Sequence, residues 1–373
     1  MTLLARLRPI LNKLTATLGL TALCWLWPSI LHAEQVLNVA NWTDYIDQKA
    51  LEDFTRETGI RVVYDTYDSN EILETRLLAG GSGYDIVVPS ATFLQRQIKA
   101  GVYQKLNKSL LPNLKGVAPE IAARLAVYDP GNEYSVPYMW FTTGIAYNTA
   151  KIKDRLGDRA MDSWDVVLKP ENLRKLSDCG VYFLDSPEDL LAIAARYVGL
   201  SPDLRDAASV RRAAEVVARV RPYVRKFHSS EYINALANGD ICLAIGWAGD
   251  SFQARNRARE AGAGVDIAYV IPREGTLMSI DTLAIPKDAR HVTEAHKFID
   301  FLLRPEIAAR NTAVTNFANP IPASKASLPP AIVENKSIYP DGPMMAKLFT
   351  VGMKEPDIQK IITREWSRVK VGR

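Results

Sequence analysis

Short apolar runs alternate with amphipathic stretches in the part of the chain that follows position 34. The apolar runs are rich in valine and isoleucine, which is typical of strands that are buried on both faces. They predict strands at Val36–Ala40, Ile60–Tyr64 and Ile86–Val88. The amphipathic stretches predict one helix that begins after Asp47 and stops at Gly59, and others that begin after Ser69 or Asn70 and at about Thr92.

The same alternation continues through the rest of the chain. Further strands are predicted at Val181–Leu184, Ile241–Ile245, Ile267–Ile271 and Asp281–Ile285. Further helices are predicted at Pro187–Val198, at Ser229–Asn238, at about Thr293–Leu303 and from Pro305 onwards. Strands that alternate with helices of roughly ten residues indicate an α/β fold, in which a largely parallel sheet is covered on both faces.

The first 33 residues have the pattern of a secretory signal peptide. A cationic start without acidic residues is followed by an apolar stretch from Leu14 to about Trp27, and Ala33 offers a cleavage site. The alternative is an uncleaved membrane anchor, but the stretch is shorter than the roughly 20 residues that a span needs. We therefore expect an exported protein that is processed after about Ala33.

The length that remains predicts two lobes. Removing 33 of 373 residues leaves 340, which exceeds the roughly 250–300 residues at which a single core stops growing. No repeat and no Gly/Ser linker interrupts this part of the sequence, so short segments should cross between the lobes. We expect crossings near residues 138–145 and 270–280, with a ligand cleft beyond the carboxyl ends of the strands.

The charge of the processed chain excludes several classes of partner. The full chain has 46 Lys+Arg and 42 Asp+Glu, and three of the basic residues lie in the leader, so the balance becomes 43 against 42. A nearly neutral protein has no general electrostatic attraction to nucleic acid or to an anionic membrane. We expect neither as a partner.

Two cysteines remain after processing, Cys179 and Cys242. An even pair in an oxidising compartment predicts a disulfide. Closing a loop of about sixty residues would stabilise the fold by roughly 4 kcal/mol in the chain-entropy account. The alternative is two separate buried thiols, and a free reactive cysteine would favour a cysteine-dependent enzyme.

Aromatic, hydroxyl and carboxylate side chains recur where the predicted strands end. They are Trp42, Thr43, Asp44, Tyr45, Ser90, Trp247 and Asp250. A desolvated ammonium group gains about 2 kcal/mol or more over a Trp or Tyr face, while carboxylates accept its hydrogen bonds. Carboxylates at both ends of an aromatic slot would select a diamine. The alternative is that the tryptophans pack between lobes and the aspartates cap helices.

Six strings of residues carry a resemblance to a known family. They are Asn41–Ile46, Val87–Ser90, Pro137–Trp140, Asp162–Asp165, Asn238–Cys242 and, most specific, Ile245–Asp250. With these strings, essentially the whole chain after the leader resembles the bacterial periplasmic polyamine-binding proteins of putrescine/spermidine transporters. The resemblance implies a two-lobed type II periplasmic-binding fold. It also implies a monomer without cofactor or metal that delivers a polyamine to an inner-membrane ABC permease.

The resemblance also implies a binding site. Positions that match the family's cleft walls are Trp42, Thr43, Tyr45, Ser90 and Trp247. Asp250 and Asp281 match carboxylates that receive ligand amines. Asp189 takes the place of a third acid, commonly a glutamate in the family, with a shorter reach, and Glu188 beside it is the alternative.

Two positions depart from the putrescine-binding pattern. Ser279 stands where those proteins have an aromatic residue, and Phe317 stands where they have a tyrosine. Losing a ring enlarges the slot for the methylene chain, and losing the phenol removes a hydrogen-bonding group. We therefore expect a cationic ligand that is longer or has a different head group, such as cadaverine, agmatine or spermidine.

The lobes implied by the resemblance have discontinuous boundaries. The first comprises residues 34–140 plus about 275–305, and the second comprises about 141–274 plus 306–373. Ligand would bind first to the first lobe, and closure would then add Asp189, Trp247 and Asp250 from the second.

Other functions are less well supported by the sequence. His228, His291 and His296 do not follow predicted strands, and no pair of them has the spacing of a metal site. We therefore expect no catalytic residue and no metal. The alternatives that remain open are another amine or an ω-amino acid as ligand, and a sensor receptor in place of an importer.

Overall fold

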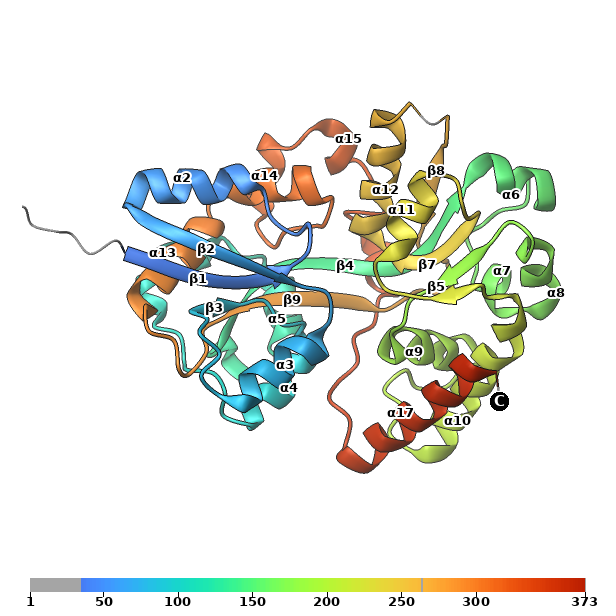
Figure 1. Ribbon diagram of the computed structural model, residues 1–373, viewed down its shortest axis with the longest axis horizontal. Coiled ribbons are helices and arrows are strands. Elements are labelled where there is room, and N and C mark those ends of the chain that lie inside the picture. The colour runs from blue at the N-terminus through green and yellow to red at the C-terminus, as the bar shows by residue number, and fades with distance from the viewer. Residues whose placement is uncertain (1–34, 263, 373) are drawn as a thin grey trace, which may run out of the picture. The chain divides into compact units, whose positions relative to one another are not determined.

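One mixed sheet runs through the residues that the structure, a computed structural model, describes, which are 35–262 and 264–372 (Figure 1). Its strands are β1 (Gln35–Trp42), β2 (Ile60–Tyr67), β3 (Ile86–Val87), β4 (Ser135–Asn148), β5 (Val181–Phe183), β6 (Lys226–Phe227), β7 (Leu243–Trp247), β8 (Ile267–Val270) and β9 (Met278–Ala284). Their order is β2-β1-β3-β9-β4-β7-β5-β6, and β8 pairs with β4 beside this path. The predicted leader, residues 1–33, lies outside the described residues.

The long strand β4 is shared by both halves of the sheet. Its residues 135–142 pair with β9, and its residues 143–147 pair with β7. We call β1, β2, β3 and β9 the first half, and β5 to β8 the second half. The crossing that was predicted near residues 138–145 therefore lies inside a strand. The sequence did not reveal this strand because Pro137 interrupts it, beside a bulge between Pro137 and Met139.

The directions of the strands refine the prediction of a largely parallel sheet. The pairs β1–β3, β5–β6 and β5–β7 are parallel. The pairs that join the halves are antiparallel, since β4 runs against β7, β8 and β9. Apolar runs indicate strands that are covered on both faces, but they carry no information on strand direction.

Helices cover both faces of the sheet (Figure 1). They are α2 (Gln48–Thr58), α3 (Asn70–Ala79), α4 (Ala91–Lys99), α5 (Pro119–Leu125), α6 (Thr149–Leu156), α7 (Asp165–Leu168), α8 (Pro170–Leu173), α9 (Pro187–Tyr197), α10 (Ala207–Val220), α11 (Glu231–Ala237), α12 (Ala248–Glu260), α13 (Val292–Leu302), α14 (Pro305–Thr315), α15 (Pro330–Val333), α16 (Gly342–Met345) and α17 (Pro356–Val371). Short 3₁₀ turns are η1 (Lys108–Leu110), η2 (Pro112–Gly116), η3 (Pro130–Asn132), η4 (Arg174–Leu176), η5 (Arg221–Tyr223) and η6 (Pro322–Ser327). No described helix combines the length and apolar character that a membrane span requires.

Alternating side chains of the first-half strands enter different cores. Val39 and Ile86 pack in a cluster with α2, α13 and α14, whereas Ala40 and Val87 pack in a cluster with α3, α4 and α5. This follows from the period of two along a strand. In the second half, α7, α9, α10 and α17 share one core, and α11 and α12 contribute to another.

Helix α2 begins and ends where the sequence predicts. The Asp47 side chain accepts a hydrogen bond from the Lys49 amide at 3.1 Å, and Gly59 follows the helix with a φ of 72°. A left-handed residue at this position favours glycine, which has no Cβ to clash. Because α2 follows β1 directly, its cap fixes the loop that carries Tyr45.

The disulfide between Cys179 and Cys242 is present, with the two Cα atoms 5.5 Å apart. It links the residues that precede β5 and β7, which are neighbours in the sheet. The prediction of a disulfide is thereby confirmed over the alternative of two separate thiols.

The last part of the chain contacts both halves. Arg310 of α14 forms ion pairs with Asp47 and Asp53 on the first half. In the C-terminal helix α17, Trp366 donates its indole hydrogen bond to Asp185 of the second half at 2.7 Å. The segment between these helices therefore passes from the first half to the second.

Candidate functional site

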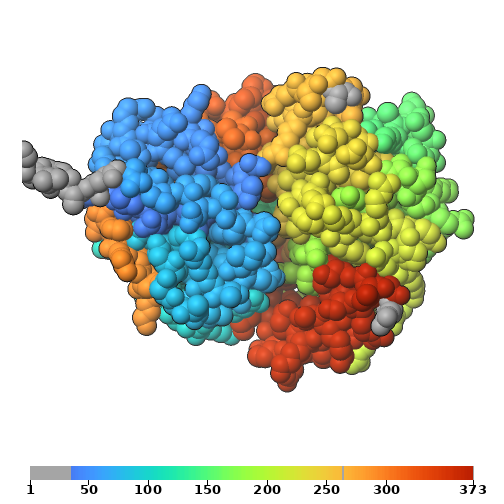
Figure 2. Space-filling view, viewed as in Figure 1, coloured from blue at the N-terminus to red at the C-terminus, as the bar shows by residue number. Residues whose placement is uncertain are grey.

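The predicted site residues lie at the ends of elements from both halves of the sheet. Trp42 ends β1, Trp247 ends β7, Ser90 precedes α4, and Phe317 follows α14. The carboxylates come from two first turns of helices and one strand, and they are Asp189 of α9, Asp250 of α12 and Asp281 of β9. Figure 2 shows a seam between the first-half and second-half residues on one face of the molecule.

Asp281 is a buried carboxylate beside the end of β3. Its side chain is 3% exposed and accepts a hydrogen bond from the Ser90 hydroxyl at 2.6 Å. Burial and the negative charge of Asp189 raise the pKa of Asp281 to about 6. The Tyr45 hydroxyl lies near enough to be affected by Asp281, yet it is buried without a hydrogen-bond partner of ordinary geometry.

Asp250 has a similar environment in the first turn of α12. The Tyr232 hydroxyl donates to it at 2.8 Å and accepts the Trp247 amide at 3.0 Å, so one phenol holds both the strand end and the helix start. Desolvation raises the pKa of Asp250 to about 7, and the charge of Asp281 adds to the effect. Arg257 acts in the opposite direction, but it is paired with the exposed Asp44 at 2.7 Å.

Asp189 is the third carboxylate and is 6% exposed. It accepts hydrogen bonds from Ser186 at 2.5 Å, from the Trp247 indole at 3.3 Å, and from Thr143. Despite these donors, burial raises its pKa above the usual value. Its bond to Trp247 holds the indole against the carboxylate, and this links α9 to the end of β7.

Aromatic rings connect the carboxylates across the two halves. The ring centroid of Phe317 lies 4.7 Å from that of Tyr45 and 5.1 Å from that of Phe141. The ring centroids of Phe141 and Trp247 are 5.9 Å apart. Phe317 also lies so close to the first turn of α12 that a Cβ at Gly249 would overlap its ring. The site therefore has an apolar wall that is continuous from the first half to the second.

Trp42 lies on the first-half side of the site. Its indole donates to the Val88 carbonyl at 2.9 Å, and its ring is 5.0 Å from Tyr67. Thr43 is exposed, and its amide donates to the Tyr67 carbonyl at 3.2 Å. The described contacts of Thr43 thus connect it to β2 and do not bring it to the carboxylates.

Three residues of the site were missed by the sequence analysis. Phe141 stands opposite Ser279 in the β4–β9 register, and Thr143 and Tyr232 donate to the carboxylates. Phe141 directly follows the string Pro137–Trp140, so its position next to a family motif was a usable signal. Thr143 and Tyr232 gave no such signal, because their roles depend on which elements pack together.

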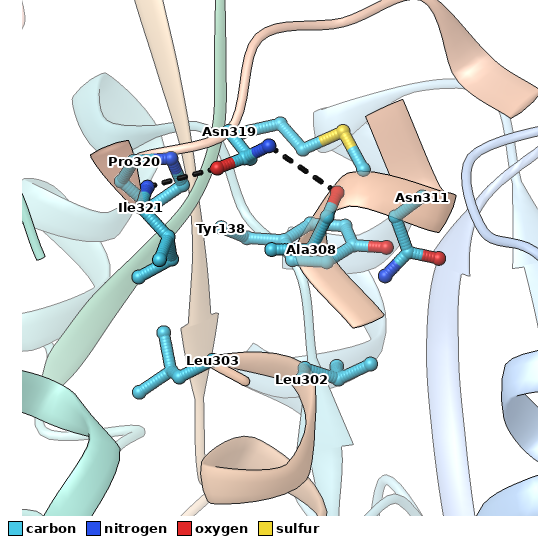
Figure 3. A pocket seen from close by; sticks show the side chains of 9 residues that line it. Tyr138, Leu302, Leu303, Ala308, Asn311, Asn319, Pro320 and Ile321 are labelled. Atoms are coloured by element: carbon cyan, nitrogen blue, oxygen red, sulfur yellow. Dashed lines mark hydrogen bonds between the residues drawn. The ribbon is translucent and has the colours of Figure 1, made fainter. Parts of the chain in front are cut away.

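A small cavity of about 10 Å³ lies away from the carboxylates, in the first half (Figure 3). Asn319 borders it and ties down the chain after Phe317, since its side chain donates to the Ala308 carbonyl at 3.2 Å and accepts the Ile321 amide at 2.9 Å. These hydrogen bonds of Asn319 fix the segment that follows Phe317. No group of three or more His, Cys, Asp or Glu side chains in the described residues is placed to hold a metal ion.

The arrangement suits a cation with an apolar body. Burial raises the pKa of all three carboxylates, Asp189 adds to the rise at Asp281, and Asp281 adds to the rise at Asp250. Arg257, the base that acts on Asp250, already has a partner in Asp44. An ammonium group would restore the ionised form of each carboxylate, because an opposite charge favours ionisation. The rings between them would cover methylene groups.

These features define a solute-binding protein, and the comparison with known families agrees. Residues 49–340 match the family described as bacterial extracellular solute-binding protein. The chain belongs to this family, whose members bind solutes and are not enzymes.

Individual proteins of known name are similar to this chain over most of its length. The chain is 51% identical to the putrescine-binding periplasmic protein SpuD of Pseudomonas aeruginosa, over 91% of this chain and 93% of that protein. It is 48% identical to the putrescine-binding periplasmic protein PotF of Escherichia coli, over 92% of this chain and 94% of that protein. Among solved structures, a putative spermidine/putrescine ABC transporter from Listeria monocytogenes matches with a TM-score of 0.80 and 30% identity. The match covers 91% of this chain and 100% of that one. The prediction of family and fold is confirmed.

Proposed function

We propose that this protein captures a polyamine of the putrescine class in the periplasm and delivers it to an ABC importer in the inner membrane. One observation carries the proposal: three carboxylates with raised pKa values, Asp189, Asp250 and Asp281, lie among aromatic rings. Uncompensated buried charge is costly to a fold, so its presence is best explained by a cationic ligand.

The relatives support this assignment. Two proteins that share about half of the residues are named as putrescine-binding and periplasmic. Delivery to an importer and cleavage of the leader after about Ala33 are part of the same proposal. A dication fits the site better than an ω-amino acid, because a ligand carboxylate would need a base and Arg257 is engaged with Asp44.

We also propose that the two halves act as lobes that close on the ligand. Trp42, Tyr45, Ser90 and Asp281 would bind first, and Asp189, Trp247 and Asp250 would follow on closure. The ion pairs of Arg310 favour placing α14 with the first lobe, with the second lobe resuming at α17. Ligand shifts this equilibrium only by its differential affinity for the closed state.

The departures at Ser279 and Phe317 favour a ligand longer than putrescine or one with a different head group. Phe141 stands beside Ser279 in the sheet and keeps one aromatic ring at this place. Introducing a ring by Ser279→Phe should therefore shift preference toward the shorter diamine. Equal preference in wild type and variant would contradict this.

The proposal is tested by calorimetric titration of ligand-stripped mature protein. The panel is putrescine, cadaverine, agmatine, spermidine and 4-aminobutyrate. Micromolar or tighter binding of at least one polyamine, and weak binding of the zwitterion, is the expected result. The proposal would be refuted if no polyamine binds, or if 4-aminobutyrate binds clearly more tightly than every polyamine.

A further inference from the structure

A second cavity adjoins the carboxylate site and has no role in the function proposed so far. It measures about 20 Å³ and lies where the two halves meet. Its lining includes Ser90, Thr92, Tyr128, Glu188 and Ser279. A cavity needs about 10–15 Å³ to hold one water molecule, and an ammonium group is of similar size. There is room here for one small polar group.

The cavity borders the carboxylate site through two of the predicted site residues. Ser90 lines it while donating to Asp281 at 2.6 Å, and Ser279 lines it from β9. The short side chain of Ser279 leaves this space beside the site, whereas an aromatic residue at 279 would extend into it. Ser90 therefore belongs both to the cavity wall and to the carboxylate site.

Glu188 supplies a carboxylate to this cavity. It lies next to Asp189 in the first turn of α9, which begins with Pro187. Arg96 and Lys354 are the bases near enough to act on it, but Arg96 is paired with Glu74 at 2.6 Å, and the Lys354 ammonium donates to the Gly352 carbonyl at 2.9 Å. No base among the described residues forms an ion pair with Glu188 itself. Desolvation and the charge of Asp189 raise the pKa of Glu188 to about 7.

We propose that Glu188 and the cavity beside Ser279 form an additional cation subsite, which receives the terminal ammonium group of a triamine. The inference rests on the proposed function. Asp189, Asp250 and Asp281 bind the two cations that a diamine offers, and Glu188 binds a third. The hydroxyls of Ser90 and Thr92 accept further hydrogen bonds from the same ammonium group. The protein accordingly prefers spermidine to putrescine.

The test compares putrescine and spermidine by calorimetry at pH 8 in wild type, Glu188→Gln and Glu120→Gln. Glu120 is a matched control, because it also follows a proline in the first turn of a helix, α5, and it is exposed. Loss of a hydrogen bond to a charged group changes affinity by roughly tenfold or more. Glu188→Gln should lower the spermidine-to-putrescine affinity ratio by about tenfold, and Glu120→Gln should leave the ratio within twofold.

Ser279→Leu provides a second test that does not remove a charge. The leucine side chain should fill the cavity and weaken the binding of spermidine more than the binding of putrescine. A cooperative thermal transition would show that the variant is folded. An unchanged ratio in both Glu188→Gln and Ser279→Leu would overturn the subsite, as would wild-type protein that binds putrescine tightly and spermidine weakly. If wild type binds neither amine, nor cadaverine or agmatine, the proposed function itself fails.

Discussion

At the scale of single residues, burial of the carboxylates opposes folding, and we expect the same burial to favour binding of a cation. Asp250 and Asp281 have pKa values of about 7 and about 6 because folding removes them from water. Each is held by a hydroxyl donor, Tyr232 or Ser90, which orients the oxygens without neutralising them. In the proposed function, an ammonium group would supply the missing charge, and the free energy that the ligand-free site loses on folding would be recovered on binding.

Asp250→Asn separates these two effects. A carboxyl group whose folded pKa is raised binds more protons in the native state, so unfolding free energy falls as pH rises from about 4 to about 7. Removing the charge should stabilise the ligand-free protein by about 1–3 kcal/mol at pH 8, and the gain should disappear near pH 4. The same change should weaken the binding of a dicationic ligand by about 2–5 kcal/mol.

Urea unfolding and calorimetry measure the two quantities. Asp357→Asn is the matched control, since Asp357 also lies in the first turn of a helix, α17, with its side chain 92% exposed. A variant at 250 that loses stability, or that binds the ligand as wild type does, would remove Asp250 from the site.

The pH dependence of affinity follows from the same groups. Alkylammonium groups remain charged below about pH 9, so the ligand does not titrate in the range of interest. Protons compete with it for Asp250 and Asp281 as pH falls through about 7 and about 6. Affinity should fall at least about tenfold between pH 8 and pH 5.5, with proton release on binding near pH 6.5. Titrations in buffers of different ionisation enthalpy would detect this, and constant affinity would contradict it.

The sequence predicted the residues that project from strand ends better than it predicted their partners. Trp247 and Asp250 follow an apolar run within a specific string, and the structure places them beside the other carboxylates. Thr143 and Tyr232 lie 46 and 18 residues from the carboxylates that they contact. Such pairings depend on tertiary packing, for which a single sequence gives no periodic signal.

At the scale of elements, the start of α12 packs against the segment that carries Phe317. Gly249 has ordinary helical geometry, so alanine would fit its backbone, but the added Cβ would overlap the Phe317 ring. Gly249→Ala should displace that ring and weaken the ligand by about tenfold or more, the order of cost that overpacking a tight contact carries. Gly342→Ala is the control, because a Cβ there meets open space. Calorimetry with unchanged affinity in Gly249→Ala would show that this contact is not part of the binding-competent state.

We expect the disulfide to act on stability and not on the site. Cys179 and Cys242 lie in the core that α7, α9, α10 and α17 share. Replacing both by alanine should lower the unfolding free energy by about 2–5 kcal/mol and leave the ligand dissociation constant within threefold. Urea unfolding and a binding titration of the double variant check this. A large loss of affinity at unchanged stability would contradict it.

Helices with a cap at each end were the elements that the sequence predicted best. Asp47 and Gly59 bracket α2 as expected, because both act through local chemistry. β4 was missed. It is defined by its pairing with β9 along its first part and with β7 along its second part, and a single sequence does not show such pairing.

At the scale of the whole molecule, the α/β class and the family followed from the pattern and the motifs. The antiparallel centre of the sheet did not, because strand direction is set by connections that apolar runs do not encode. Crossings were expected near residues 138–145 and 270–280, and the segment from α14 to α17, which contacts both halves, was not expected to cross. Closure of the halves should make ligand-bound protein more compact than ligand-free protein in X-ray scattering, and identical radii of gyration would contradict the proposed motion.

In the proposed function, buried carboxylates select a charged amine. The most direct test is a calorimetric comparison of putrescine with 1,4-butanediol, which has the same methylene chain and no charge, on ligand-stripped mature protein at pH 8. We predict micromolar or tighter binding of putrescine and no measurable binding of the diol. Comparable binding of the two would show that the apolar walls select the ligand, and the account given for Asp189, Asp250 and Asp281 would be wrong.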